Sequence, residues 1–257
     1  MDRTLLSLLF AGGLFVGMIL LLELGRHLGR QRRRSDEQGA RAGLGAVEGA
    51  VFALMGLLIA FTFSGAASRF DARRELIVQE ANAIGTAWLR LDLLPTDSQS
   101  ELRGLFRRYL DHRLAAYEKM PDLEAANAEL DKANALQLEI WGRAVAACHA
   151  APGPLVAQVI PALNEMFDLA ATRTAVARIH PPIIIFAMLG GLALMSAMLA
   201  GYAMAGGRVR SWIHTVGFAF IMAATVYVIL DIEFPRLGVI RVDSADEVLI
   251  ELRRGME

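Results

Sequence analysis

Two acidic residues stand at the end of the last long apolar segment of this 257-residue chain. Glu233 comes directly before Phe234-Pro235 and Asp231 lies two residues earlier, and the proline should end a helix at or just before Phe234. Carboxylates in the last turn of a helix oppose the helix dipole, which costs about 0.3 to 1 kcal/mol each. A nearby guanidinium would offset this cost, so we predict a cross-helix ion pair. A solvated helix end is the alternative.

The arginines that could form this pair follow the second apolar segment. With four membrane crossings, the second and the last apolar segments end on the same side of the bilayer, whichever way the chain is inserted. We call the charged residues expected there the collar. Its predicted members are Arg69, Asp71, Arg73, Arg74, Asp231, Glu233 and Arg236.

An apolar stripe on the second segment is the other candidate site. Large apolar residues recur there at spacings of three and four and therefore share one helix face. Contact with lipid is the ordinary role of such a face. In an oligomeric pore, rings of such residues would instead form a hydrophobic constriction that gates by dewetting. The predicted pore-lining residues are Phe52, Ile59 and Phe63 in the stripe, with Thr62 and Ser64 beside it.

Sequence motifs of enzymes are absent from the chain. There is no His-Glu-x-x-His, no phosphate-binding Gly-x-x-x-x-Gly-Lys, no Cys-x-x-Cys and no serine elbow. Cys148 and His149 are adjacent, so they would point to different faces of a helix and would not form a metal site. We therefore expect no enzyme, no cofactor and no metal. The middle of each apolar segment lacks ionisable residues, which disfavours a proton-coupled transporter.

The elements that position these residues are helices. Hydrophobic residues make up 55% of the chain, and they concentrate in four segments long enough to span a bilayer, at 5–24, 46–67, 183–205 and 212–230. The sequence predicts an all-α integral membrane protein. The first segment has no Ala-x-Ala cleavage site, so we expect it to be retained rather than removed as a signal peptide.

Small residues one helical turn apart occur in two of these segments. They form Gly13-x-x-x-Gly17 in the first and Ala193-x-x-x-Ala197-x-x-x-Gly201 in the third. Such spacing allows helix backbones to approach closely in lipid, although it also arises from composition alone. We expect these motifs to support packing between the helices without identifying a partner.

The predicted organisation is two membrane hairpins around one long insert. The first hairpin is 1–67 with an arginine-rich loop at 26–41, the insert is 68–181, the second hairpin is 182–235, and a C-terminal tail follows at 236–257. No helix breaker separates the second apolar segment from the insert, so one helix should continue from one into the other. Its charged half, which includes Glu75 and Glu80, is expected on the surface.

Prolines divide the insert into pieces of helical length. No window shows the period-two alternation of a strand, so helices are expected throughout. Their predicted ranges are about 68–93, 97–119, 122–149 and 154–179, and Pro161 should kink the last helix or end its first turn.

Arginines near the segment ends are equally numerous on the two sides of the predicted bilayer. The first segment, however, has only Arg3 before it and five arginines shortly after it, which favours loops inside and the insert in the periplasm. The loop at 26–41 would then be a cytoplasmic anchor or contact anionic lipid headgroups. No aromatic residues interleave its arginines, so nucleic acid is not an expected partner. The bias towards arginine and alanine is typical of a bacterial genome rich in G and C.

Two stretches of the sequence resemble a bacterial membrane family. FTFSGAASRFDARRELIVQEANAIGTAWLRLDLLP and LDIEFPRLGVIRV are similar to the bestrophin-like family, whose function is unknown. The resemblance implies the architecture of bestrophins, which are pentameric anion channels whose second helix lines a hydrophobic neck. It would place the helical domain in the cytosol, in conflict with the charge count. The chain also lacks the N-terminal signature of bestrophins.

The leading hypothesis is a homo-oligomeric channel of the bacterial inner membrane, lined by the second helix and permeable to anions such as halide. The resemblance implies a pentamer. The alternative is a non-conducting, membrane-anchored interaction or signalling module that acts through its helical insert.

Overall fold

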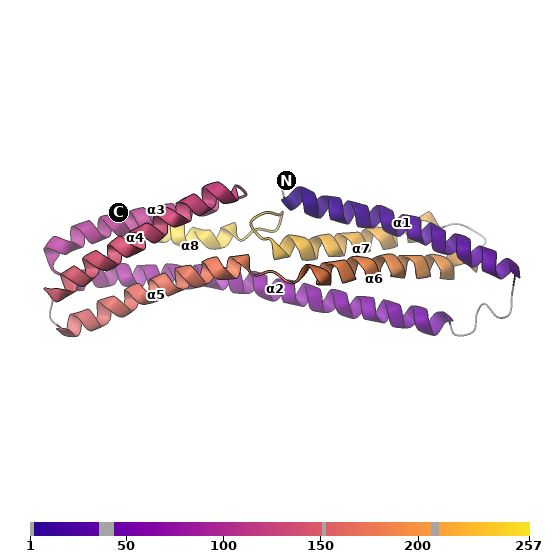
Figure 1. Cartoon of the computed structure of the whole chain (residues 1–257), viewed down its shortest axis with the longest axis horizontal. Helices are drawn as coiled ribbons and strands as arrows, with labels where there is room; N and C mark the ends of the chain where they lie inside the picture. Colours follow the sequence, from indigo (N-terminus) through magenta and orange to yellow (C-terminus); the bar gives the residue numbers. More distant parts are fainter. Residues whose placement is uncertain (1–2, 36–43, 151–152, 207–210) are drawn as a thin grey trace. The chain divides into compact units, whose positions relative to one another are not determined.

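The computed structural model describes residues 3–35, 44–150, 153–206 and 211–257. Its regular elements are all helical within these ranges, so the predicted all-α class is confirmed. Short 3-10 turns lie at Leu91–Leu93 and Met204–Gly206. The α-helices are α1 (Arg3–Ser35), α2 (Leu44–Arg90), α3 (Thr96–Glu118), α4 (Leu123–His149), α5 (Gly153–Arg178), α6 (Ile183–Ala203), α7 (Trp212–Glu233) and α8 (Asp243–Arg254) (Figure 1).

The chain folds as two compact units. The membrane unit comprises Met1–Arg69 and His180–Phe234, and the helical unit comprises Phe70–Ile179 and Pro235–Glu257. Within the described residues, four helical stretches are long and apolar enough to cross a membrane, as the sequence predicted. They contain α1, the first half of α2, α6 and α7. The helix α2 is a single element of 47 residues, and its two halves belong to different units.

Helices α1 and α6 touch backbone to backbone. A Cβ atom added at Gly201 would lie 1.9 Å from the carbonyl oxygen of Leu22, and one added at Gly25 would lie 2.0 Å from that of Met198. Only glycine allows this approach, because it has no Cβ. Ala193 and Ala197, which precede Gly201 on the same face of α6, are fully buried.

The predicted small-residue motifs therefore differ in their roles. The motif that ends at Gly201 lies at the helix contact, whereas in the first segment Gly17 packs against Leu194 and Gly13 faces open space. The glycines of α1 that contact α6 most closely are Gly25 and Gly29. Gly29 lies in a segment predicted to be a loop, so its close contact with Tyr202 of α6 could not be predicted from the sequence.

Helix α2 is the least enclosed of the four spans. Only 11% of its most apolar window is buried, compared with 33% for α7. Met55 and Ala66 pack into the core of the membrane unit, and Phe52 meets Phe218 of α7 edge to face with ring centroids 6.3 Å apart. The rest of its apolar surface is left to lipid or to another protein surface.

Two regions expected to lack regular structure are helical. Helix α1 extends to Ser35, so residues 26–35 of the predicted loop form its last turns, and residues 36–41 of that loop lie outside the described residues. Arginine, leucine and glutamine are good helix formers, and nothing breaks the helix before Ser35. The expected C-terminal tail contains α8, which packs on the helical unit through the fully buried Leu249.

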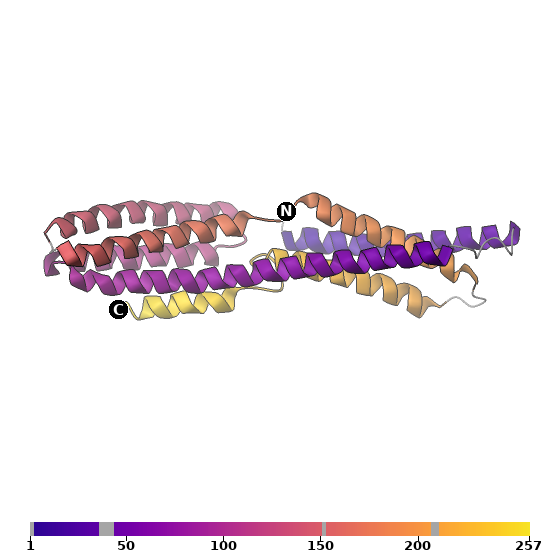
Figure 2. The same ribbon diagram turned by 90° about the horizontal axis from the view of Figure 1, so that it is seen from below.

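The helical unit is built from α3, α4, α5, α8 and the second half of α2 (Figure 2). Its helices begin and end close to the predicted prolines, and Asp122 caps α4 by accepting hydrogen bonds from the backbone of Glu124 and Ala125. Pro161 lies inside α5, which continues through it from Gly153 to Arg178. The core is largest around α3, where Leu102, Phe106, Tyr109 and Leu110 are all fully buried.

Candidate functional site

The centre of the collar is an ion pair between α2 and α7 in the membrane unit. Arg69 Nε and Nη2 lie 2.9 and 2.8 Å from Oε2 of Glu233, and Nε also lies 3.2 Å from Oε1. The Glu233 side chain is fully buried, whereas 34% of the Arg69 side-chain surface is exposed. The two donors hold the carboxylate in a charge-assisted fork and compensate for the loss of its hydration.

His180 completes this cluster from the chain that enters α6. Its Nδ1 lies 3.2 Å from Oε1 of Glu233, and its ring packs on Phe234 with centroids 4.4 Å apart. His180 directly precedes Pro181-Pro182, and Glu233 is the last residue of α7. Three elements thus converge on one carboxylate at the end of the membrane unit. His180 was not among the predicted collar residues, and its only signal was its position at the start of the third span.

The other predicted collar residues have separate partners. Arg73 is buried and donates from Nη2 to the backbone oxygen of Ile179 at 3.0 Å. Asp71 and Arg74 form an exposed pair 3.7 Å apart on one turn of α2, a type of contact worth about 0 to 1 kcal/mol. Asp231 is buried, so neither acid at the end of α7 forms a solvated helix end. Arg236 belongs to the helical unit, where it pairs with Asp246.

The ion pair gives a charge-reversal test. Glu233→Arg should lower the stability of the protein by about 3 kcal/mol, because it leaves Arg69 facing a like charge in a buried site. Combining it with Arg69→Glu should recover part of that loss, and thermal unfolding in detergent measures both. Asp71→Asn, on the exposed pair of the same helix, is the matched control and should change stability by less than about 0.5 kcal/mol. Strictly additive effects of the two charge reversals would show that the residues do not interact.

The predicted pore-lining residues do not share one environment. Phe52 is engaged by Phe218, Ile59 packs partly against the core of the membrane unit, and the Thr62 hydroxyl donates to the backbone oxygen of Leu58 at 2.7 Å. Phe63 and Ser64 are exposed. They continue an exposed stripe of small residues, and we call the combined surface the outer face of α2. Its members are Gly49, Ala53, Gly56, Ala60, Phe63 and Ser64.

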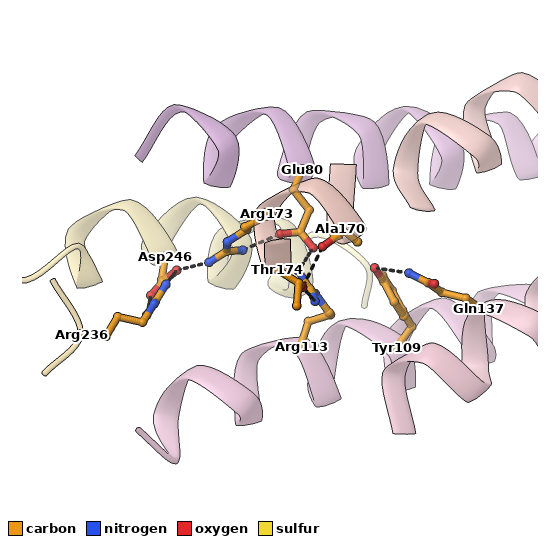
Figure 3. Close-up of polar contacts among 9 residues, drawn as sticks. All are labelled: Glu80, Tyr109, Arg113, Gln137, Ala170, Arg173, Thr174, Arg236 and Asp246. Atoms are coloured by element: carbon orange, nitrogen blue, oxygen red, sulfur yellow. Dashed lines mark hydrogen bonds and ion pairs between the residues drawn. The ribbon is translucent and has the colours of Figure 1, made fainter. Parts of the chain in front are cut away.

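A buried network of charged residues lies in the helical unit (Figure 3). Glu80 of α2 is fully buried between two arginines, with Oε1 2.5 Å from Nη2 of Arg113 and Oε2 2.5 Å from Nη1 of Arg173. Arg173 also contacts Asp246 at 2.9 Å. Asp246 accepts from both Nη atoms of Arg236 at 2.7 and 2.9 Å. We call these five residues the buried network.

The aromatic ring of Tyr117 packs against the arginines of the buried network. The guanidinium carbons of Arg173 and Arg236 lie 4.0 and 4.2 Å from the ring centroid of Tyr117, close enough for cation–π attraction. Burial raises the pKa of Tyr117, so this phenol stays neutral at physiological pH. Burial works against the charge of Arg113, but the neighbouring Glu80 carboxylate raises its pKa, so the guanidinium stays protonated.

A second acidic centre joins α3 to α4. Glu129 lies 2.5 Å from Nζ of Lys119, 3.0 Å from Nζ of Lys132 and 2.6 Å from Nδ1 of His112. Hydrogen bonds from Lys119, Lys132 and His112 lower the pKa of Glu129 to about 2. Because its folded pKa is depressed, Glu129 stabilises the fold above its unfolded pKa, and this contribution is lost as the pH falls towards 2.

Glu80 was expected on the surface, and the structure shows that this expectation was wrong. A charged residue on a long polar helix is usually solvated, but Glu80 shares the face of the buried Ile77 and Ile84. That spacing was the available signal. The partner arginines are far away in sequence, with Arg173 93 residues from Glu80, so only the folded chain brings them together.

In each of these clusters the buried acidic side chains pair with basic side chains. No group of three or more histidine, cysteine or acidic residues in the described part of the chain could hold a metal ion. Cys148 is buried, and burial raises the pKa of its thiol, so it is not an activated nucleophile.

Comparison with known proteins identifies the family. The bestrophin-like domain family matches residues 11–246, and the chain therefore belongs to it. No curated protein matches the sequence. Two crystal structures of a bacterial bestrophin homolog from Klebsiella pneumoniae share the fold. One, of a point mutant, has a TM-score of 0.71 at 14% identity, and covers 94% of this chain and 95% of its own. The other, solved by Zn-SAD phasing, has a TM-score of 0.67 at 14% identity, with coverages of 93% and 98%.

The likeness extends over nearly all of both chains. At such low identity it establishes the fold and not the activity. The chain is thus a multi-pass membrane protein of the bestrophin-like family.

Proposed function

We propose that this protein is a homo-oligomeric channel of the bacterial inner membrane that conducts anions such as halide, with the outer face of α2 on the conduction path. The α2 span is lightly buried, because only 11% of its most apolar 18-residue stretch lies inside the protein. This light burial carries the proposal. Copies of the chain arranged around an axis would cover this surface. Membership of the bestrophin-like family supports the proposal, and a pentamer follows from the resemblance to bestrophins.

The chemistry of the outer face suits a hydrophobic gate. Gly49, Gly56 and Ala60 are exposed and add little bulk, so Phe63 would be the large apolar group closest to the axis. A narrow apolar ring excludes water, and small changes in its diameter decide whether it conducts. No catalytic role is proposed for the charged clusters, in which each buried acid pairs with at least one basic side chain.

Flux through liposomes tests this proposal. Phe63→Ala should raise halide flux several-fold, because it removes the bulk of the proposed ring and allows water to enter. Phe220→Ala, which truncates another exposed phenylalanine, on α7, is the matched control and should leave flux unchanged. The mass of the purified oligomer, measured for each variant, shows whether assembly is intact. A monomeric, non-conducting protein would overturn the proposal in favour of an interaction module acting through the helical unit.

Orientation is tested separately. Because the first span has one arginine before it and five shortly after it, we expect residues 68–181 to face the periplasm. A cysteine at the exposed Ser100, made together with Cys148→Ala, should react with an impermeant maleimide in cells whose outer membrane alone is permeable. Labelling that requires lysis of the inner membrane would place these residues in the cytosol.

A further inference from the structure

The membrane unit contains an apolar pocket beside the collar. Its volume is about 220 Å³, and it lies among α2, the chain entering α6, and α7. Most of its lining comes from segments that span the membrane. The lining residues are Leu58, Phe61, Thr62, Gly65, Arg69, Pro181, Ile185, Phe186 and Ile229.

The pocket wall favours an apolar occupant. Thr62 carries the one hydroxyl group in the lining, and it already donates to the backbone oxygens of Leu58 and Ile59 at 2.7 and 3.1 Å. The other side chains, apart from Arg69, are hydrocarbon or aromatic. A polar solute in this space would lose hydrogen bonds to water without gaining replacements, whereas a hydrocarbon chain would lose none.

Arg69 supplies a single polar end. Its Nε and Nη2 atoms are occupied by Glu233, but Nη1 has no hydrogen-bond acceptor among the described residues. Nη1 lies over the adjacent Gly65, where an added Cβ would be only 3.2 Å away. Glycine at this position therefore leaves room both for the guanidinium and for the pocket beneath it.

We propose that this pocket holds one acyl chain of a bilayer phospholipid, with a phosphate oxygen of that lipid accepting a hydrogen bond from Nη1 of Arg69. The apolar part of α2 ends at Ala67, so Arg69 reaches the depth at which headgroup phosphates lie. Lipid surrounds the apolar segments that line the pocket once they lie in a bilayer. A bilayer lipid thus matches both the hydrocarbon wall and the single donor at its end, whereas a second protein surface would have to bring its own acceptor.

Filling the pocket tests this site. Gly65→Leu places a branched side chain in it, and Ile185→Trp fills it from α6 without crowding Arg69. The matched control is Gly12→Leu, on an exposed position of α1 where an added Cβ meets nothing within 4 Å. Phospholipid retained by the purified protein after extensive detergent washing is counted per protomer by phosphorus analysis and mass spectrometry.

We expect the wild type and Gly12→Leu to retain one more phospholipid per protomer than either filled variant. Diacylglycerol with the same chains should not replace the retained lipid in the wild type, because it lacks the phosphate. Equal retention in all variants would overturn the proposal. So would an unchanged lipid count with an altered oligomer mass, since a second copy would then occupy the pocket. Neither measurement depends on ion flux, so failure of this site and failure of the channel proposal can be told apart.

Discussion

Replacing Gly201 with alanine should destabilise the membrane unit by roughly 3 kcal/mol or more, the upper range of overpacking penalties. The new methyl group would lie 1.9 Å from the carbonyl oxygen of Leu22, which is backbone and has no rotamer in which to yield. Helices α1 and α6 would have to separate, and the contacts of Ala193 and Ala197 with their surroundings would loosen with them.

The matched control lies on the same helix. A Cβ added at Gly191 meets nothing within 4 Å, so Gly191→Ala should leave stability unchanged or raise it by about 0.5 to 1 kcal/mol. Thermal unfolding of both variants in the same detergent compares these two changes in stability. A similar small change at the two positions would contradict the close approach of these helices.

Removing the charge of Glu80 should produce an effect of comparable size in the helical unit. Glu80→Leu leaves Arg113 and Arg173 buried without the carboxylate that lies 2.5 Å from each, and such a loss costs about 3 to 5 kcal/mol. We expect lower thermal stability and earlier proteolysis within residues 70–179. Glu75→Leu, on the exposed side of α2, should have little effect.

A second substitution separates charge from packing. Adding Arg113→Met to Glu80→Leu removes one of the stranded cations and should restore part of the stability, as is typical when a buried ion pair is replaced by apolar groups. If the double variant were less stable than Glu80→Leu by the full cost of Arg113→Met alone, the two residues would not be coupled.

The membrane spans and the insert helices could be predicted from the sequence because their signals are local. A run of apolar residues identifies a span, and prolines identify helix ends, so Thr96 and Leu123 open helices within one residue of the predicted positions. The acids at the end of α7 were also recognisable, since carboxylates oppose a helix C-terminus and therefore require a partner.

The features that the sequence did not predict depend on which side of a helix faces the rest of the protein, and residue spacing does not reveal this. The spacing of the stripe on α2 does not reveal which side of the helix meets the rest of the protein, and in the structure Met55 and Ala66 turn inward while Phe63 stays exposed. Likewise, an arginine such as Arg173 on an amphipathic helix looks solvated until its acidic partner is found far away in sequence. Gly29 resembled a loop residue because arginines surround it.

The contact between α1 and α6 also determines where the membrane unit can deform. Two helices whose backbones touch cannot slide or tilt past each other without a clash, so they move as one rigid body. Helix α2 is held mainly by side chains such as Met55 and Phe52 and by the fork between Arg69 and Glu233, which are contacts that can be remade after a small displacement. Any opening or closing motion in this unit should therefore take the form of α2 rocking against α7, which supplies Phe218 and Glu233, while α1 and α6 stay together.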